Sequence, residues 1–448
     1  MRSDDLLLSY YGDDLTGSTD AMEALALSGV PTVLFLREPS EAERARFAGV
    51  RAIGLAGTSR SETPEWMDAH LPEAFSWLAS LRAPLCHYKV CSTFDSSPTR
   101  GNIARAMTIG RTVFRQDFVP LLVGAPQLRR YTAFGTLFAA YRDAIWRIDR
   151  HPVASRHPVT PMLEADLRLH LAKQSDANVA LADLVCLNAA DADRRIDALL
   201  AEKPDALLLD VIDAGTQRAA GEQLWRLRER GGRFAVGSSG VEYALLAAWK
   251  AAGLVPGTAA FPPPGPAERI AAVSGSCSPT TERQIRHALA HGFDPVALDA
   301  ALLAGADDAD LHGTMEAVLA QAATSLDAGR SVLLYTALGP ATDAGAAIEA
   351  KPDGRHNIGR HLGFLLQTLV RRHDLTRAVI AGGDTASHAL AALQGHALTT
   401  LLPLPRTPGS PLCTLHSDDR ETDGLQIALK GGQIGTDAYF CDIRDGIA

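Results

Sequence analysis

The sequence predicts an α/β protein with two domains, each a mainly parallel sheet flanked by helices. Short apolar runs typical of buried strands alternate with Ala- and Leu-rich segments of helical periodicity. The segment PGTAAFPPPGPAE at 256–268 interrupts this alternation once, and the alternation restarts after it. A chain of 448 residues has room for two or three domains, and two large ones are the simplest division.

Each predicted strand is an apolar run bounded by polar or turn-forming residues. In the first half these runs lie at 6–11, 32–36, 52–56, 87–90, 118–123, 206–212 and 233–237. In the second half they lie at 269–273, 331–337, 377–383 and 425–430. Five prolines within the thirteen residues of 256–268 exclude a helix or a central strand there. We therefore expect a first domain at 1–250, a linker at 251–268 and a second domain at 269–448.

Charge and hydropathy exclude several classes of protein. The net charge is −9 and the 43 Lys and Arg residues are spread along the chain, which argues against nucleic acid as the main partner. Basic pairs such as Arg129-Arg130 are interpreted as solvated surface. No apolar run reaches the ~18 residues of a membrane helix, and the N-terminus lacks a signal-peptide pattern, so we expect a cytoplasmic protein with no membrane partner.

Cysteine and histidine spacing gives no sign of a metal site. The six cysteines form no CxxC pair, and the 14 histidines show neither HxH nor HExxH spacing. The sequence therefore predicts neither a disulfide framework nor a zinc centre, and no metal ligand is assigned from it.

The first strand-to-helix turn carries two adjacent acids, in LLLSYYGDDLTGSTDAMEAL at 6–25. Ligands of open α/β sheets bind at the carboxyl ends of the strands, which is where Asp13 and Asp14 lie. Helix capping explains one acid but does not require two that repel each other. At least one of them is therefore predicted to bind a substrate hydroxyl, hold a cation or take a proton.

Two further turns of the first half carry candidate ligand-binding residues. The stretch YKVCSTFDSSPTRGN at 88–102 combines cations and hydroxyls after a strand end, a composition that suits a small polyhydroxy carboxylate but is also common in loops. Its candidates are Lys89, Ser92, Thr93, Asp95 and Arg100. In RFAVGSSGVEYAL at 233–245, Ser238 and Ser239 lie in a turn that offers backbone N–H groups to an anion, although a helix start needs Ser and Gly anyway.

The second half has three Gly- and Ser-rich turns after predicted strands. The stretch SGSCSPTT begins a helix with Pro279 at its first position, but it has no Walker Gly-Lys-Ser/Thr. The stretches AGGDTAS and ALKGGQIG follow two other strands. Together the three turns predict a nucleotide whose phosphates lie at helix N-termini. The candidates are Ser274, Ser276, Ser278, Gly382, Gly383, Asp384, Thr385, Lys430, Gly431 and Gly432.

The motifs GDDLTGSTDA, GSCSPTT, GGDTAS, PGSP and ALKGGQIG, in that order across nearly the whole chain, resemble those of the four-carbon acid sugar kinases. The resemblance implies that the first domain binds a sugar acid and the second binds ATP, with Mg²⁺ as cofactor and the active site in the interdomain cleft. It implies phosphorylation of a hydroxyl of threonate, erythronate or 3-oxo-tetronate, and it makes a homodimer plausible. By motif, Asp13, Asp14, Lys89, Ser92, Thr93 and Arg100 fall on the substrate side, and Ser276, Ser278, Gly382, Gly383, Asp384, Thr385 and Gly432 on the nucleotide side.

The chain departs from the family pattern where the substrate would bind. Many members have a compact K-x-D-S-T-x-R-G-N stretch, whereas this chain reads KVCSTFDSSPTRGN, with Cys91 in the usual place of an acid and extra residues before Arg100. It also reads GGDT for GGET and LKGGQIG for LKSGNFG. These differences point to a branched or oxidised sugar acid rather than threonate.

The resulting hypothesis is a kinase in which Asp14 orients or deprotonates the attacking hydroxyl and Asp13 holds substrate hydroxyls or a cation. Lys89 and Arg100 would hold the substrate carboxylate. A sugar-acid dehydrogenase or epimerase is the enzymatic alternative, weakened because no GxGxxG follows a predicted strand. A sugar-acid sensor without catalytic activity is the other alternative, although it would have no need for paired acids facing a nucleotide.

Overall fold

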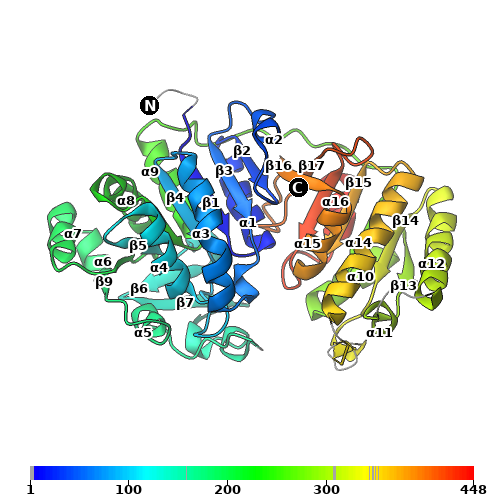
Figure 1. Cartoon of the computed structure of the whole chain (residues 1–448), viewed down its shortest axis with the longest axis horizontal. Helices are drawn as coiled ribbons and strands as arrows, with labels where there is room; N and C mark the ends of the chain where they lie inside the picture. The colour runs from blue at the N-terminus through cyan, green and yellow to red at the C-terminus, as the bar shows by residue number, and fades with distance from the viewer. Residues whose placement is uncertain are drawn as a thin grey trace. The chain divides into compact units, whose positions relative to one another are not determined.

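The chain divides into two compact units, Met1–Ala259 and Ala260–Ala448, in the computed structural model (Figure 1). The structure describes residues 5–157, 159–305, 309–342, 344, 345, 348, 350, 351 and 353–447. The dividing point lies inside the proline-rich segment. Both units are α/β, as the sequence predicts, and every predicted strand overlaps an observed one.

The sheet of the N-terminal unit is parallel, with strand order β2-β3-β1-β4-β11-β5-β10-β9. Its strands are β1 (Leu8–Gly12), β2 (Thr32–Phe35), β3 (Ala52–Ala56), β4 (Leu85–Lys89), β5 (Val119–Leu122), β9 (Val179–Ala182), β10 (Ala206–Leu209) and β11 (Phe234–Gly237). Every residue of β1, β2, β4, β5, β10 and β11 is buried. Burial on both faces explains why these strands are continuous apolar runs in the sequence.

Helices flank this sheet (Figure 1). They are α1 (Leu15–Leu27), α2 (Glu41–Ala45), α3 (Pro64–Ser80), α4 (Ile103–Phe114), α5 (Leu167–Ala172), α6 (Leu184–Leu187), α7 (Ala192–Ala201), α8 (Ala214–Leu227) and α9 (Gly240–Ala251). They pack in two groups, α3 with α4, and α9 with both α1 and α8.

A small antiparallel sheet of β6 (Arg130–Ala133), β7 (Thr136–Tyr141) and β8 (Ala144–Arg147) follows β5 and was not predicted. Phe134 and Gly135 connect β6 to β7 with φ of 51° and 77°, the two positive values of a type I′ turn. Its strands are half-exposed or exposed, so they lack the continuous apolar signal of the main sheet. The main-sheet strand β9 is also partly exposed and was missed for the same reason.

The sheet of the C-terminal unit has the order β13-β14-β12-β15-β18-β17-β16, parallel from β13 to β18 and antiparallel at β17 and β16. Its strands are β12 (Ala271–Ser274), β13 (Phe293–Ala297), β14 (Ser331–Tyr335), β15 (Arg377–Ala381), β16 (Gly395–Leu402), β17 (Leu412–Ser417) and β18 (Gln426–Lys430). Its helices are α10 (Pro279–Ala290), α11 (Ala300–Leu303), α12 (Ala309–Asp327), α14 (Gly354–Arg372), α15 (Gly383–Ala392) and α16 (Tyr439–Asp445). The strands β13, β16 and β17 were not predicted.

Two composition-based expectations can be compared with the structure. All six cysteines are free thiols, as the absence of CxxC pairs suggested. Among the described residues, no helix combines the length and hydropathy that crossing a bilayer requires.

Candidate functional site

Three parallel strands of the N-terminal unit end side by side and bring their following turns together. Gly12 at the end of β1 pairs with Ala56 of β3 on one side and Lys89 of β4 on the other. Backbone bonds continue the contact beyond the strands, because the Asp13 N–H donates to the Lys89 carbonyl at 2.9 Å and the Arg60 N–H donates to the Asp13 carbonyl at 3.0 Å. The predicted GDD turn therefore lies against the turn after β3 and the end of β4.

Arg60 binds both acids of the GDD turn. Its Nε and Nη2 donate to the two carboxylate oxygens of Asp13 at 3.1 and 2.6 Å, and its Nη1 donates to Asp14 Oδ2 at 2.7 Å. A bidentate guanidinium and a further bond to the neighbouring acid balance the repulsion between the two carboxylates. One shared cation thus explains how two adjacent acids are tolerated in this turn.

The two acids differ in surroundings. Asp14 is the N-cap of α1, since its Oδ1 accepts from the Gly17 N–H at 2.7 Å, and its side chain is 29% exposed. Asp13 is 4% exposed. Burial raises the pKa of Asp13 to about 6; the Arg60 guanidinium opposes this increase and the Asp14 carboxylate adds to it. Asp14 is therefore the more accessible of the two acids, while Asp13 holds Arg60.

Lys89 adds a second cation, which is buried, to this cluster. Its side chain is 4% exposed, and its ammonium lies 3.4 Å from Asp20 Oδ2 on α1. A Cβ at Gly17 would lie 2.4 Å from Asp14 Oδ1 and 2.7 Å from Lys89 Nζ. The first turn of α1 is therefore closely surrounded by the charged groups of the site, and only glycine leaves them room.

The predicted loop after β4 forms its own hydrogen-bonded group. The Thr93 hydroxyl accepts from the Cys91 thiol at 3.0 Å and donates to Asp95, which also accepts from Thr160 at 3.4 Å. Burial alone would raise the pKa of Asp95, but the charge of Arg60 and the Thr93 bond together hold it below its usual value.

In the described part of the chain, the remaining substrate-side candidates form no hydrogen bond or ion pair with Arg60, Asp13 or Asp14. Ser92 is partly exposed. Arg100 is exposed and donates to the Ser61 carbonyl at 3.1 Å. Ser238 and Ser239 are fully buried, and the Ser238 hydroxyl donates to the Val123 carbonyl at 2.6 Å. Their role in binding substrate stays a prediction, and in this structure the two serines present no exposed hydroxyl.

In the C-terminal unit, the turn after β12 contacts the turn after β18. Ser278 caps α10 by accepting from the Thr281 N–H at 3.0 Å, and its hydroxyl donates to the Gly432 carbonyl. The Thr281 hydroxyl donates to Ser276 Oγ at 3.1 Å and lies 3.2 Å from the same Gly432 carbonyl. The buried Ser274 hydroxyl is 3.4 Å from the Ser276 N–H. Ser274, Ser276, Ser278 and Gly432 are thus brought together as the sequence suggested.

Lys430, the last residue of β18, is buried beneath this group of hydroxyls. It is 1% exposed, and its ammonium donates to Thr281 Oγ1 at 3.0 Å and to the Gly431 carbonyl at 2.7 Å. Burial lowers the pKa of Lys430 to about 7, with no carboxylate opposing it. A lysine of this kind gains a strong partner when an anion approaches.

The third turn begins α15. Gly382 has φ of 121°, which favours glycine, and its N–H donates to the Lys430 carbonyl at 2.9 Å. Among the described side chains none caps the start of α15, and a Cβ at Gly383 would meet no described atom within 4 Å. Thr385 is buried beside Gly275; the backbone of Asp384 belongs to α15, but its side chain lies outside the described residues. An uncapped helix start next to open space suits an anion.

A pocket opens beside these turns within the C-terminal unit. Its polar lining includes Thr336, Arg355 and Thr385, and Gly275 and Cys277 border it from the turn after β12. The rest of the described lining is apolar and consists of Ala300, Ala337, Ala344, Ile348 and Ile358, with Gly345. The pocket therefore combines a mostly apolar lining with a few polar groups beside the Gly- and Ser-rich turns.

Sequence reasoning missed three residues of these sites, Arg60, Asp20 and Thr281. Arg60 follows β3, a strand that was predicted, so inspecting the turn after every predicted strand would have found it. Asp20 and Thr281 lie inside helices, and only the packing of α1 and α10 brings them to Lys89 and Lys430.

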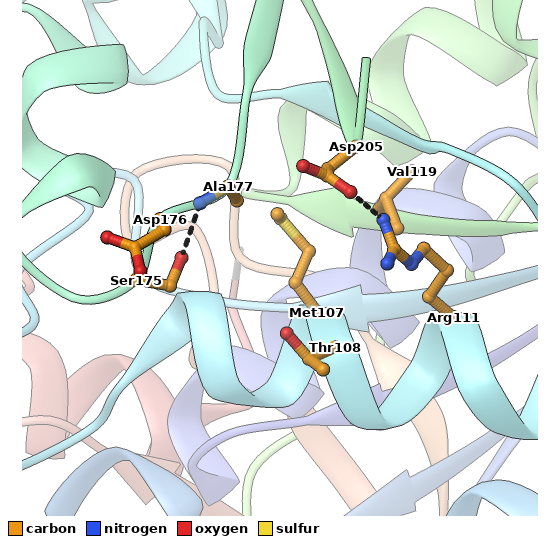
Figure 2. Close-up of a pocket in the computed structure, with 8 residues that line it drawn as sticks. All are labelled: Met107, Thr108, Arg111, Val119, Ser175, Asp176, Ala177 and Asp205. Carbon is orange, nitrogen blue, oxygen red and sulfur yellow. Dashed lines mark hydrogen bonds and ion pairs between the residues drawn. The ribbon is translucent and has the colours of Figure 1, made fainter. Parts of the chain in front are cut away.

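A different hollow lies at the amino ends of the strands of the N-terminal sheet (Figure 2). It is lined by Val119, the first residue of β5, by Asp205, which precedes β10, and by Ala177, which precedes β9. Arg111 of α4 pairs with Asp205 across it. Since ligands of parallel sheets bind at carboxyl ends, this hollow at the amino ends is not the candidate site.

Comparison with known proteins gives the following matches. One family model, described as a sugar-binding N-terminal domain, matches residues 8–245, and another, described as a nucleotide-binding C-terminal domain, matches residues 271–440. A Paraburkholderia graminis protein named 3-oxo-isoapionate kinase is 46% identical over 98% of this chain and 94% of its own. A Methylobacterium radiotolerans 3-oxo-tetronate kinase is 30% identical over 99% of this chain and 100% of its own.

Solved structures share the fold. A crystal structure of a Haemophilus influenzae protein is similar to this chain with a TM-score of 0.71 and 21% identity, covering 96% of this chain and 98% of the other. A Salmonella typhimurium structure has a TM-score of 0.76, also at 21% identity, over 98% and 99% of the two chains. At this identity the similarity establishes fold alone.

Proposed function

This chain belongs to the four-carbon acid sugar kinase family, with its sugar-binding N-terminal and nucleotide-binding C-terminal domains, and we propose that it phosphorylates a branched, oxidised sugar acid of the 3-oxo-isoapionate kind. Its relatives' names establish the class of activity, a phosphotransferase acting on a sugar-acid hydroxyl. The observation that carries the finer proposal is the 46% identity to the 3-oxo-isoapionate kinase, against 30% to a 3-oxo-tetronate kinase. The altered KVCSTFDSSPTRGN stretch independently favours an unusual acid.

On the acceptor side, the charged group around Arg60 holds the reacting hydroxyl. Asp14 is accessible and its Oδ2 faces the guanidinium, so a substrate hydroxyl that reaches Asp14 is oriented by a fixed carboxylate. Phosphoryl transfer needs positioning and charge neutralisation more than a strong base. Asp13 keeps Arg60 in place and does not contact the substrate in this proposal.

On the donor side, kinase relatives imply the use of ATP. The uncapped start of α15 at Gly383, the hydroxyls around Ser276 and the buried Lys430 would bind the phosphates. The pocket bordered by Gly275 and Thr336 would hold the base. Mg²⁺, which binds with few protein ligands and through phosphate oxygens, would neutralise the phosphate charge there.

Transfer requires the hydroxyl and the γ-phosphate to meet, so closure of the two units during turnover is part of this proposal. The test is a coupled ADP-release assay with Mg-ATP against D- and L-threonate, D-erythronate, 3-oxo-tetronates and 3-oxo-isoapionate. We expect turnover with 3-oxo-isoapionate well above the ATP-only background, and lower kcat/KM for the straight-chain acids.

Other outcomes of the assay would change the proposal. A higher kcat/KM for a straight-chain acid would overturn the branched-acid assignment and leave the kinase. ATP binding by calorimetry without turnover of any acid would contradict the proposed substrate class. No ATP binding at all would remove the nucleotide side as well.

A further inference from the structure

Arg130 is placed at the carboxyl edge of the N-terminal sheet by the segment that follows β5. After β5 ends at Leu122, the chain passes through a short 3₁₀ turn at Pro126–Leu128 and begins β6 with Arg130. The backbone of Arg130 is fixed there, because its N–H and carbonyl both bond to Ala125, at 3.1 and 2.9 Å. The sequence alone suggested a solvated Arg129-Arg130 pair, but only Arg129 is fully exposed and Arg130 is partly buried.

The guanidinium of Arg130 lacks an acidic partner. Its Nη1 donates to the carbonyls of Leu128 at 2.9 Å and Arg129 at 3.3 Å, while its Nε is buried without a hydrogen-bond acceptor anywhere in the described part of the chain. No carboxylate of the described residues forms an ion pair with it. Burial lowers the pKa of Arg130, and the opposing effects of Cys91 and Tyr131 do not restore it. A buried donor without an acceptor and a partly buried charge without a counter-ion are each costly, so an anionic ligand is expected to neutralise the charge.

The other cations of the cluster are already engaged. Arg60 is bound by Asp13 and Asp14, and Lys89 is paired with Asp20. The predicted carboxylate binder Arg100 is exposed and bonded to a backbone carbonyl. An acid substrate brings one more negative charge, and a cation already paired inside the protein gains less from it than an unpaired one.

Arg130 also lies near the substrate loop. Its charge interacts with the Cys91 thiol, which is two residues beyond Lys89 and also interacts electrostatically with Arg60. Arg130 is therefore close to the start of the stretch in which this chain departs from the compact family motif. A carboxylate bound there would lie near the Asp14 and Arg60 group that is proposed to hold the hydroxyl.

We propose that Arg130 binds the carboxylate of the sugar-acid substrate through its guanidinium, which no carboxylate of the described residues neutralises. This inference rests on the proposed function, since it assumes an acid substrate. It assigns the charge recognition of the acid to Arg130 rather than to Arg100.

The test compares Arg130→Gln and Arg130→Lys with a matched control, Arg129→Gln on the neighbouring exposed side chain, and with Arg100→Gln, which changes another predicted carboxylate binder. Loss of a hydrogen bond to a charged group should raise KM for the acid about 10- to 100-fold in Arg130→Gln. KM for ATP should stay within about twofold of wild type, and Arg130→Lys should recover part of the loss. Arg129→Gln should leave KM for the acid nearly unchanged, and Arg100→Gln should raise it less than Arg130→Gln does.

A second readout separates charge recognition from a structural effect. We expect wild type to prefer the acid strongly over its neutral amide, and Arg130→Gln to lose most of that preference even if its stability falls. Equal preference in wild type and Arg130→Gln, or a larger KM effect in Arg100→Gln, would overturn the inference while leaving the kinase intact. If no acid is turned over by wild type, the proposed function fails, and calorimetric binding of the same acids to wild type and Arg130→Gln still decides the inference: binding weakened in Arg130→Gln supports it, whereas equal binding, or none to wild type, overturns it.

Discussion

The two units present chemically different groups at the carboxyl ends of their parallel strands. In the N-terminal unit the turns after β1 and β3 and the end of β4 are ordered by full charges, with Arg60 between Asp13 and Asp14, and Lys89 against Asp20. In the C-terminal unit the turns after β12, β15 and β18 are ordered by hydroxyls and backbone groups around one cation, Lys430.

The difference follows from what each edge would bind. A small polyhydroxy acid offers hydroxyls and one charge, so fixed side-chain carboxylates and cations can recognise each group separately. A nucleotide offers several phosphate oxygens, which helix N-termini and glycine-rich turns approach with backbone N–H groups. The charges of the N-terminal site are paired with one another, whereas Lys430 in the C-terminal site has no carboxylate partner among the described residues. Substitutions at the two sites should therefore have effects of different kinds.

The largest effect is expected from Asp14→Asn. Asparagine caps helices as well as aspartate does, so α1 should keep its N-cap while the charge and the hydroxyl-orienting oxygen are lost. Removing a group that assists proton transfer costs about 10²- to 10⁴-fold, and we expect kcat to fall within that range with ATP affinity unchanged. Steady-state kinetics and calorimetry measure both. Asp68→Asn, which changes a surface acid paired with Arg105, is the control and should be silent. Unchanged kcat in Asp14→Asn would remove Asp14 from the mechanism.

The next effect concerns Lys430, the buried cation among the hydroxyls of the C-terminal unit. In Lys430→Met, ATP affinity at pH 7 should fall about 10- to 100-fold, since a charge-assisted bond to phosphate is lost. The control Arg286→Gln removes a surface cation from the same unit and should leave ATP affinity intact. An ATP affinity equal to that of wild type would show that Lys430 is structural.

The lowered pKa of Lys430 adds a pH signature to that comparison. Between about pH 7 and its ordinary value of 10.5, the unfolded protein binds a proton at Lys430 that the folded protein lacks. The free energy of unfolding of wild type should therefore rise with pH across this window because of Lys430, and this component should vanish in Lys430→Met. Conversely, ATP favours the charged lysine, so wild-type affinity should weaken as pH rises above 7. If the ATP affinity of wild type did not change with pH, this would contradict a buried Lys430 that loses its charge above pH 7.

Alanine substitutions at one glycine of each unit should affect the stability of the free protein differently. An alanine at Gly17 would press on Asp14 and Lys89, so Gly17→Ala should destabilise the free protein by about 1–3 kcal/mol. An alanine at Gly383 has open space, so Gly383→Ala should leave the free protein as stable or stabilise it by up to about 1 kcal/mol, yet weaken ATP binding if phosphate approaches that backbone. Thermal unfolding with and without ATP measures both. Equal destabilisation in both variants would contradict the contrast.

The strands, helix starts and candidate residues of the two sites could be predicted where a short stretch of sequence carries the pattern. The strands β1, β4 and β5 were predictable because both their faces are buried, which leaves a continuous apolar run. Pro279 marked the start of α10 correctly, and Asp14 is indeed a helix cap as well as a candidate ligand. Each of these signals lies within a few residues of the feature it predicts.

The unpredicted parts depend on residues far apart in the chain. Arg60 reaches Asp13 from 47 residues away, and Lys430 reaches Thr281 from 149. No local pattern encodes such pairs, since the alignment of parallel strands creates the first and the packing of α10 creates the second. Arg130 could not be predicted from a local pattern either. Its position next to Arg129 suggested an exposed side chain, but the fold partly buries it.

The smallest effect is expected at the opposite edge of the N-terminal sheet, in the hollow of Figure 2. The side chains of Arg111 and Asp205 are 34% and 37% exposed, so their ion pair should contribute under about 1 kcal/mol to stability. Asp205 also accepts from the Asn178 N–H at 2.9 Å, so it keeps a partner in Arg111→Gln. We expect kcat and both KM values of Arg111→Gln to equal those of wild type, with a slight decrease in melting temperature. A drop in kcat/KM of more than about tenfold without unfolding would mean that function reaches the amino ends of the strands, and the assignment of the site to the carboxyl ends alone would then be wrong.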